Sequence, residues 1–334
     1  MSEGGDITNY GTAIRSAFEY LLEGYPECFV IGQGLWSPWY VGNSMTDLDK
    51  KFGKERIIDT PVSESGCTGA AIGASLAGMK PIVVHPRMDF MLYAVDPIVN
   101  QAAKWSHMFG GQAHPGVTIR SIINRGGEQG AQHSQALHSW FAHIPGLRVV
   151  MPSTVSDARD LLIASVLCSD PVLYIDDRWL YEIEDKIGEV KLQSLDNISP
   201  QLLCEGDDIT LVGSGYSLQL CLQAQKNLQD LGFSIDVIDL RVLNPFNPNL
   251  IADSVKKTGR LLVVDGGWSN CGFAAEVISS VSEIVNPTYF RHRPCRITLP
   301  DAPAPTARNL EKNYYFTEEE IAEKALEMIN EKLS

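Results

Sequence analysis

Short apolar runs alternate with segments of helical period along the whole chain, and this alternation restricts the fold class more than any other feature of the sequence. Short apolar runs are typical of strands buried on both faces, and the amphipathic segments between them are typical of covering helices. We therefore expect an α/β protein with parallel sheets. In the first half, the expected strands are Cys28–Gln33, Pro81–His85, Val117–Ile123, Leu147–Met151 and Pro171–Ile175.

Helices are expected between these strands. They cover Tyr10–Leu22, Gly66–Ala77, Ala94–Phe109, Gln135–Ala142 and Val155–Leu167. Ser153 and Thr154 precede the last of these helices, and their side chains are suited to cap it.

A polar connection divides the chain into two parallel-sheet domains. Residues 182–205 mix charged residues, serine, asparagine and proline without firm periodicity, which is typical of a linker. We place the first domain at residues 1–181 and the second at residues 206–334. The second domain has expected strands at Asp208–Gly213, Ser234–Asp239, Arg260–Asp265 and Arg296–Leu299, and expected helices at Ser217–Leu231, Asn249–Lys257, Cys271–Ile284 and Thr317–Lys332.

Composition excludes several classes of protein. A chain of 334 residues is long enough for two ordinary domains, each with its own core. The formal net charge of −14 disfavours nucleic acid as a partner. No apolar window approaches the roughly 20 residues that a membrane span requires, and no secretory signal is recognisable at the start. We therefore expect a cytoplasmic protein.

One stretch, from Asp59 to Gly73, combines an acid with many small residues. Glu64 stands between an expected strand end and a helix start rich in glycine and alanine. Small residues let a flat ligand or another backbone approach closely, and Glu64 is able to exchange a proton there. The alternative is a helix-capping role, because a carboxylate near a helix N-terminus is stabilised without any catalysis.

Two other stretches contain candidate site residues. Phe90 and Tyr93 lie three positions apart, so on a helix they share a face and either wall a pocket for an aromatic heterocycle or form plain core. His133 lies in a glycine-rich polar loop ahead of a helix, where an imidazole either moves a proton, holds an anion or is simply solvated. His138 and His143 fit no common metal spacing and are interpreted as structural.

Motifs in a fixed order along nearly the whole chain resemble a known family. They are Arg56–Glu64 with Gly66, Asp89–Phe90, Asn100–Lys104, Gly130–Gln135, Phe141–Leu147, Pro152–Thr154, Val237–Arg241, Val255–Leu261, and Gly267–Trp268 with Gly272–Phe273. Together they resemble the beta subunit of the thiamine-diphosphate-dependent decarboxylating first component of 2-oxo acid dehydrogenase complexes, in the transketolase-like superfamily. The resemblance implies a pyrimidine-binding domain followed by a transketolase-type C-terminal domain.

The resemblance also implies an activity and roles for individual residues. The matching glutamate, Glu64, would hydrogen-bond N1′ of the cofactor's aminopyrimidine and favour the tautomer that removes the C2 proton. Phe90 and Tyr93 would wall this ring, and His133 would face the substrate carboxylate or the lipoyl acceptor. The implied reaction decarboxylates a 2-oxo acid of the pyruvate or branched-chain type and passes the acyl group to lipoamide.

The chain lacks the Gly-Asp-Gly motif and following asparagine that hold Mg²⁺ and diphosphate in this superfamily. We therefore expect no metal ligand in this chain, and expect Mg²⁺ to be held mainly by a partner. The resemblance implies an alpha subunit in an α₂β₂ heterotetramer, without which the chain would be inactive. A lipoyl acyltransferase core is a further partner compatible with it.

Departures from the family pattern leave the substrate open. Gln33 stands where an acidic residue is usual, and Cys168, Ser169 and Asp170 differ from the pattern that often binds a structural potassium, so this ion is not predicted. One alternative is half of a split transketolase-like carboligase, which passes the substrate fragment to an aldehyde or sugar without a lipoyl partner. The other is a non-catalytic scaffold subunit of the same fold.

Overall fold

The computed structural model describes residues 6–331, which form two compact units. The first unit comprises residues 6–125, 140–198 and 243–245, and the second comprises residues 126–139, 199–242 and 246–331. No helix in the described part of the chain is long and apolar enough to cross a membrane.

The first unit is built around a seven-stranded sheet. Its order is β12 (Val242–Asn244), β6 (Arg148–Val150), β7 (Val172–Asp177), β5 (Thr118–Ile123), β4 (Lys80–His85), β2 (Cys28–Gly32) and β3 (Ile57–Asp59). The pairs from β6 to β3 are all parallel. Strand β5 is buried at every position, as expected for a parallel strand covered on both faces.

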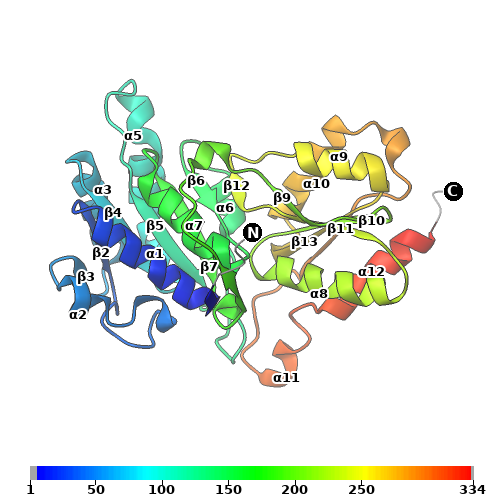
Figure 1. Ribbon diagram of the computed structural model, residues 1–334, viewed down its shortest axis with the longest axis horizontal. Helices are drawn as coiled ribbons and strands as arrows, with labels where there is room; N and C mark the ends of the chain where they lie inside the picture. The colour runs from blue at the N-terminus through cyan, green and yellow to red at the C-terminus, as the bar shows by residue number, and fades with distance from the viewer. Residues whose placement is uncertain (1–5, 332–334) are drawn as a thin grey trace. The chain divides into compact units, whose positions relative to one another are not determined.

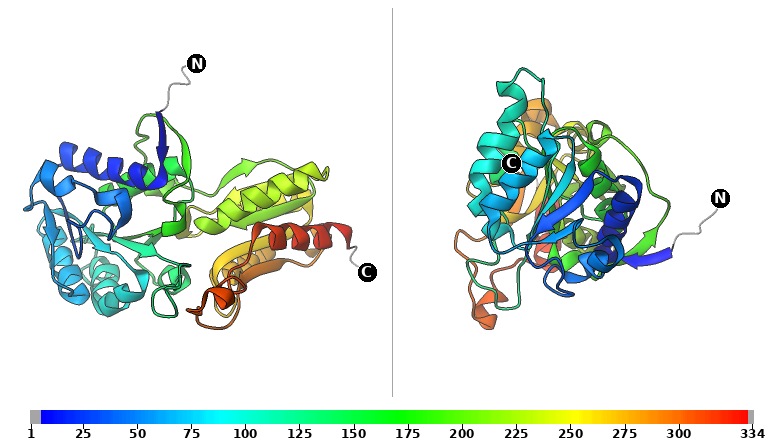
Figure 2. Two further views of the ribbon diagram at one scale, coloured as in Figure 1. Left: turned by 90° about the horizontal axis from the view of Figure 1, so that it is seen from below. Right: turned by 90° about the vertical axis from the view of Figure 1, so that its left-hand side faces the viewer.

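Helices cover both faces of this sheet (Figures 1 and 2). Helices α1 (Tyr10–Gly24) and α7 (Val155–Leu167) pack together on one face, and α3 (Glu64–Leu76) lies on the other with the helical segment that follows β4. Of the two predicted cap candidates for α7, Ser153 and Thr154, it is Thr154 whose side chain accepts a hydrogen bond from the Asp157 amide. This unit also contains α2 (Leu48–Phe52) and the antiparallel pair β1 (Asp6–Asn9) and β8 (Glu184–Ile187).

Two predicted helices of the first half are wrong in their bounds. The segment predicted as one helix over Ala94–Phe109 is divided into α4 (Met88–Met91), a 3₁₀ turn η2 (Leu92–Ala94), a π-helical segment η3 (Pro97–Ala102) and α5 (Ala103–Met108). Pro97 lacks an amide hydrogen, so a regular α-helical hydrogen bond is missing at that point. The helix predicted over Gln135–Ala142 begins only at His138, as α6 (His138–Ala142).

The second unit contains a five-stranded sheet in the order β14 (Cys295–Leu299), β13 (Leu261–Trp268), β10 (Ile209–Gly213), β11 (Ile235–Asp239) and β9 (Gln201–Cys204). The first four strands are parallel, and β9 pairs antiparallel with β11 at the edge. The helices are α8 (Tyr216–Asp230), α9 (Asn249–Thr258), α10 (Phe273–Ile284), α11 (Arg308–Glu311) and α12 (Glu318–Asn330). The predicted end of the last helix, Lys332, lies outside the described residues.

The core of this second unit lies between its sheet and the helix pair α8 and α12. Leu211 and Val237 of the strands pack with Leu218 of α8 and with Ile321 and Met328 of α12.

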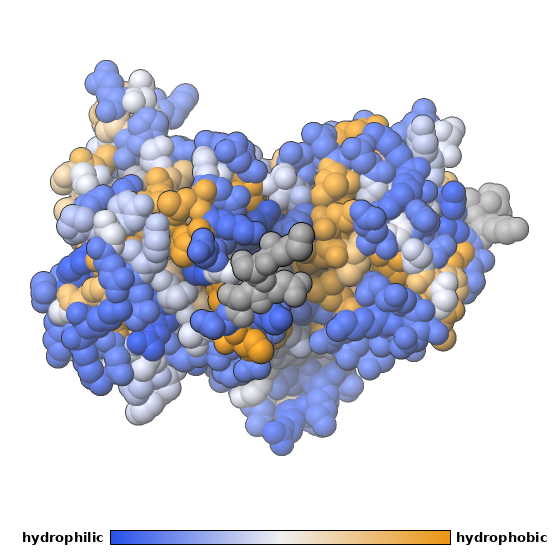
Figure 3. All heavy atoms as spheres, in the orientation of Figure 1, coloured by the Kyte–Doolittle hydropathy of each residue, from blue (hydrophilic) through white to orange (hydrophobic). Residues whose placement is uncertain are grey.

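In the view of Figure 3, polar side chains cover most of the surface, with smaller apolar patches between them. Short 3₁₀ turns complete the structure at Gly42–Met45, Arg178–Leu180, Leu195–Asn197 and Pro287–Tyr289.

Candidate active site

The topology of the first sheet marks one place as the expected ligand site. Strands β2 and β4 are neighbours, but the strand that follows β2 lies on one side of the pair and the strand that follows β4 lies on the other. In open parallel sheets, ligands bind outside the carboxyl ends of the strands at such a switch point. A small recess is present there, between the ends of β2, β3 and β4 and the start of α3.

Glu64 lines this recess. Helix α3 begins at Glu64, and the side chain is half-buried. The recess is lined by residues of these four elements: Gly32, Gln33, Thr60, Pro61, Ser63, Glu64, Cys67, Val83, Val84 and His85. The carboxylate thus lies at a helix N-terminus, where the macrodipole stabilises negative charge. The predicted acid is placed at the switch point, where it is able to act on a ligand.

Neighbouring contacts fix the chain around Glu64. Asp59 ends β3 and accepts hydrogen bonds from the amides of Gly34 (2.6 Å) and Leu35 (3.3 Å), which hold the loop that follows β2. This loop begins at Gln33. Gly32 has no room for a side chain, since a Cβ there would overlap the carbonyl oxygen of Val84. The two strands therefore approach closely beneath the recess.

Gln33 supplies an observation that points to a ligand. Its Oε1 atom is buried, and within residues 6–331 it has no hydrogen-bond partner. An unpaired buried carbonyl is unfavourable by roughly 1–3 kcal/mol. A heterocycle with an N–H donor would satisfy this oxygen, and Glu64 would satisfy a ring nitrogen. The polar groups of these residues match those of the aminopyrimidine half of thiamine diphosphate in their chemistry, whereas the recess itself has a volume of only about 10 Å³.

His85 is a member of the recess that was not identified from the sequence. It ends β4, it is 3% exposed, and its Nε2 lies 3.1 Å from Oγ1 of Thr68 on α3. Burial lowers the pKa of His85 from 6.5 to about 4, so the imidazole is neutral near pH 7. His85 stands at the end of an apolar run, and its polar partner Thr68 lies on a different element, so the local sequence does not indicate the pair.

The two candidate aromatic residues lie on different helical segments and are unequally exposed. Phe90 lies in α4 and is half-buried, whereas Tyr93 lies in the 3₁₀ turn η2 and is 73% exposed. Neither is among the residues that line the recess. A role for them against the pyrimidine ring stays a prediction. The exposure of Tyr93 makes its side chain available to a ligand or a partner surface.

His133 belongs to the second unit, whereas Glu64 belongs to the first. Its side chain is half-buried in a turn closed by a hydrogen bond from its own amide to the carbonyl oxygen of Gly130, at 3.3 Å. His138 is fully buried in the same unit, as its structural interpretation requires, and His143 is exposed. The candidate residues are therefore divided between the two units.

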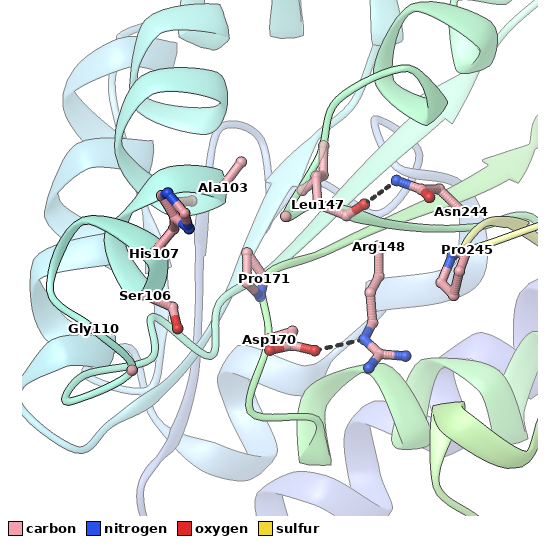
Figure 4. Close-up of a pocket in the computed structure, with 13 residues that line it drawn as sticks. Ala103, Ser106, His107, Gly110, Leu147, Arg148, Asp170, Pro171, Asn244 and Pro245 are labelled. Atoms are coloured by element: carbon pink, nitrogen blue, oxygen red, sulfur yellow. Dashed lines mark hydrogen bonds and ion pairs between the residues drawn. The ribbon is translucent and has the colours of Figure 1, made fainter.

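A larger cavity of about 550 Å³ lies elsewhere in the first unit (Figure 4). It is lined by His107 from α5, by Arg148 at the start of β6, by Asp170 just before β7, and by Asn244. Arg148 is already paired with Asp170 at 2.8 Å. Because these strands are parallel, this cavity is at the amino ends of the sheet, opposite the edge with Glu64. A choice by volume alone would therefore select the edge of the sheet opposite the candidate residue Glu64.

Within residues 6–331, no group of three or more histidine, cysteine, aspartate or glutamate side chains is arranged to hold a metal ion. The exposed face of α3 instead presents small residues, and a Cβ added at Gly69 or Gly73 would meet nothing within 4 Å. A second surface is therefore able to approach α3 closely.

Comparisons with known proteins identify the two domains of this fold. Residues 7–182 match the family described as the transketolase pyrimidine-binding domain, and residues 200–321 match the transketolase C-terminal domain. A solved structure described as a split-gene transketolase, an inactive beta4 tetramer, has the same fold, with a TM-score of 0.76 at 20% identity over 99% of this chain and 100% of that one.

Two relatives of known name show the family. The chain is 35% identical to the beta-1 subunit of the pyruvate dehydrogenase E1 component of Arabidopsis thaliana, over 90% of this chain and 83% of that protein. It is 34% identical to the beta subunit of the acetoin:2,6-dichlorophenolindophenol oxidoreductase of Bacillus subtilis, over 85% of this chain and 82% of that protein. The chain therefore belongs to the family of transketolase-type beta subunits that includes those of pyruvate dehydrogenase and acetoin oxidoreductase.

Proposed function

We propose that the chain is the beta subunit of a thiamine-diphosphate-dependent 2-oxo acid dehydrogenase, which decarboxylates a 2-oxo acid and passes the acyl group to lipoamide. The observation that carries this proposal is the position of Glu64. It is an acid at a helix N-terminus, in the recess at the switch point of a pyrimidine-binding domain. Membership of the beta-subunit family supports the same activity.

The recess residues would each act on the pyrimidine half of the cofactor. When bound, thiamine diphosphate supplies the carbanion and the electron sink for cleaving the bond beside a carbonyl carbon. Glu64 would share a proton with N1′ of the ring, and Gln33 would accept a hydrogen bond from an N–H group. Phe90 and Tyr93 would contact the ring faces, and His133 would bind the substrate carboxylate or the acceptor.

The diphosphate half would be bound by another polypeptide. This chain contains no Gly-Asp-Gly motif, and an alpha subunit in an α₂β₂ heterotetramer would supply the ligands of Mg²⁺ and of the diphosphate. A lipoyl acyltransferase core is the further partner we propose for acyl transfer. The cytoplasmic location expected from the sequence stays a prediction.

A second substrate class is favoured by the comparisons. The relative named as an acetoin oxidoreductase beta subunit is as similar to this chain as the pyruvate dehydrogenase subunit is. Cleavage of acetoin breaks a bond beside a carbonyl carbon without loss of CO₂. Acetoin therefore belongs in the same assay as the 2-oxo acids.

Co-expression with an alpha-type subunit tests the proposal. The purified complex is assayed for consumption of pyruvate, branched-chain 2-oxo acids and acetoin, with a lipoyl domain as acceptor. Glu64→Gln should lower kcat by about 10²- to 10⁴-fold, because proton transfer by a positioned acid contributes that much. Glu55→Gln makes the same chemical change at an exposed position outside the recess and should leave kcat unchanged.

Three outcomes would contradict this proposal. Unchanged activity of Glu64→Gln would favour the non-catalytic scaffold. Consumption of a sugar or aldehyde acceptor without reduction of the lipoyl domain would favour the carboligase. Turnover by the isolated beta chain would remove the need for an alpha subunit.

A further inference from the structure

The loop that carries His133 is attached to the second unit at its start. The amide of Gly126 donates to the hydroxyl oxygen of Tyr315 at 3.4 Å, and the amide of Glu128 donates to Oε1 of Glu311 at 3.1 Å. These partners follow β14 in the chain and belong to the same unit as the loop. Hydrogen bonds from two backbone amides to side chains of the second unit thus fix the first half of the loop.

At its other end, the loop is attached by a buried pair of side chains. Nε2 of His138, the first residue of α6, lies 2.8 Å from Oδ1 of Asp265 on β13. The two residues are 2% and 7% exposed. The same carboxylate accepts the amide of Gly267 at 2.9 Å and the amide of Ala274, at the start of α10, at 3.0 Å. Asp265 therefore joins the loop to a strand end and to a helix N-terminus.

The contacts of Asp265 and His138 determine which of the two side chains carries the proton. Burial alone would raise the pKa of Asp265, but the attraction and hydrogen bond of His138, together with the two amides, outweigh burial and hold this pKa below its usual value of 3.8. The carboxylate is ionised near pH 7 and has no proton to donate, so Nε2 of His138 carries the proton. The ring orientation is thereby fixed.

A catalytic histidine base is also often oriented by a carboxylate. His138 is too buried for that role. Nδ1 of His138 is enclosed and, among residues 6–331, has no hydrogen-bond partner. A general base needs its free nitrogen within hydrogen-bond reach of a substrate proton. The ring also packs on backbone, since a Cβ added at Gly267 would lie 3.2 Å from Cε1 of His138. This geometry holds a chain segment in place.

The segment between His133 and His138 is itself packed. Ser134, Ala136 and Leu137 are each at most 4% exposed, so a shift of His138 would displace packed neighbours along the loop. We propose that His138, held by Asp265, is a positioning residue that fixes the loop so that His133 meets the substrate or the acyl acceptor. This inference rests on the proposed function, because the role of His133 is part of that proposal.

The test compares variants in the complex with an alpha-type subunit. His138→Phe keeps a ring of similar shape and removes the hydrogen bond to Asp265, whereas His138→Gln keeps an N–H donor near the position of Nε2. We expect His138→Phe to lower kcat about 10- to 100-fold, as misplacement of a catalytic group by about 1 Å does. His138→Gln should recover most of kcat. The Kd of thiamine diphosphate should stay within about twofold, since Glu64 lies in the first unit.

The decisive measurement is a double-mutant cycle with His133→Ala. If His138 acts through His133, then adding His138→Phe to His133→Ala lowers kcat no further. The proposal would be overturned if the fold-loss of kcat in the double variant equalled the product of the losses in the two single variants. A wild-type kcat in His138→Phe would also overturn it. His143→Phe is the matched control, because it makes the same substitution at an exposed position five residues further along the chain.

Hydrogen exchange of the isolated full-length chain separates this inference from the proposed function. His138→Phe should raise the exchange rate of the amides of residues 126–137 and leave the amides of β2 and α3 unchanged. Unaltered exchange in the loop would overturn the positioning role even if the complex is active. If the wild-type complex binds no thiamine diphosphate, the proposed function fails, while the exchange result still decides whether His138 fixes the loop.

Discussion

At the scale of single residues, His85 makes the stability of the protein depend on pH. An imidazole in the unfolded chain takes up a proton near pH 6.5, whereas buried His85 does so only near pH 4. The unfolded state therefore binds more protons between these values, and the free energy of unfolding falls as the pH drops from 6.5 towards 4. For a shift of this size, the loss is on the order of 3 kcal/mol at the acidic end.

Urea unfolding of wild type and His85→Phe, from neutral to mildly acidic pH, measures this effect. The variant should show a shallower fall of stability with pH, whatever its stability at neutral pH. His143→Phe, at an exposed position, should follow the wild-type curve. Equal slopes for wild type and His85→Phe would show that His85 is not buried as a neutral group.

Another residue-scale prediction concerns the fully buried ion pair of Arg120 and Asp176. Both side chains are 0% exposed, and the guanidinium donates to the two carboxylate oxygens at 3.0 and 2.8 Å and to the Tyr181 hydroxyl at 2.7 Å. Asp176→Asn leaves a buried cation without its counter-charge, so we expect a loss of about 3–5 kcal/mol in chemical denaturation. Asp47→Asn breaks an exposed pair with Lys50 and should change stability by less than about 1 kcal/mol.

A charge-free replacement separates pairing from packing in this network. The double variant Arg120→Met with Asp176→Leu removes both charges and keeps apolar volume, so it should recover most of the stability lost in Asp176→Asn. A double variant as unstable as the single one would mean that packing around Tyr181, and not the unpaired charge, sets the loss.

At the scale of elements, helix α12 depends on a capping box. The Thr317 side chain accepts a hydrogen bond from the Glu320 amide at 3.4 Å, and the Glu320 carboxylate accepts one from the Thr317 amide at 3.0 Å. Thr317→Ala should lower the free energy of unfolding by about 1 kcal/mol, and Thr317→Ser should retain most of it. Hydrogen exchange in the first turn of α12 should rise in the alanine variant. Equal exchange in both variants would contradict the cap.

Elements set by local periodicity could be predicted from the sequence, and elements set by distant partners could not. Helix α7 has its predicted bounds, Val155–Leu167, because its apolar pattern and its cap at Thr154 are both local. Strands β3 and β12 have three residues each, and β8 and β9 have four, so each is defined by its neighbour and not by a pattern of its own. Pro97 interrupts an apolar period that looked continuous.

The same distinction between local and distant partners applies to the residues of the candidate site. The sequence indicates Glu64 as a candidate because its small-residue surroundings are contiguous, and Glu64 lies at the switch point between β2 and β4. His85 and Asp265 gave no comparable signal. The partner of His85 is Thr68 on α3, and the partner of Asp265 is His138, 127 positions away in the chain. Such pairs exist only after the sheets have formed.

At the scale of the whole molecule, the chain should depend on a partner for its cofactor. The recess offers groups for an uncharged heterocycle, and residues 6–331 hold no cluster suited to Mg²⁺. The net charge of −14 opposes binding of a diphosphate without a metal ion. We therefore expect the isolated chain to bind thiamine diphosphate at least about 100-fold more weakly than the complex with an alpha subunit, a difference of about 3 kcal/mol.

Isothermal titration of the isolated chain and of the complex, each with and without Mg²⁺, measures this difference. Thiamine, which lacks the diphosphate, serves as the control ligand, because its affinity should differ much less between chain and complex. Glu64→Gln should weaken thiamine and thiamine diphosphate by the same factor in the complex, since it alters only the pyrimidine half. Tight, Mg²⁺-dependent binding of thiamine diphosphate by the chain alone would show that the chain itself holds the diphosphate, and the assembly with an alpha subunit would then need another explanation.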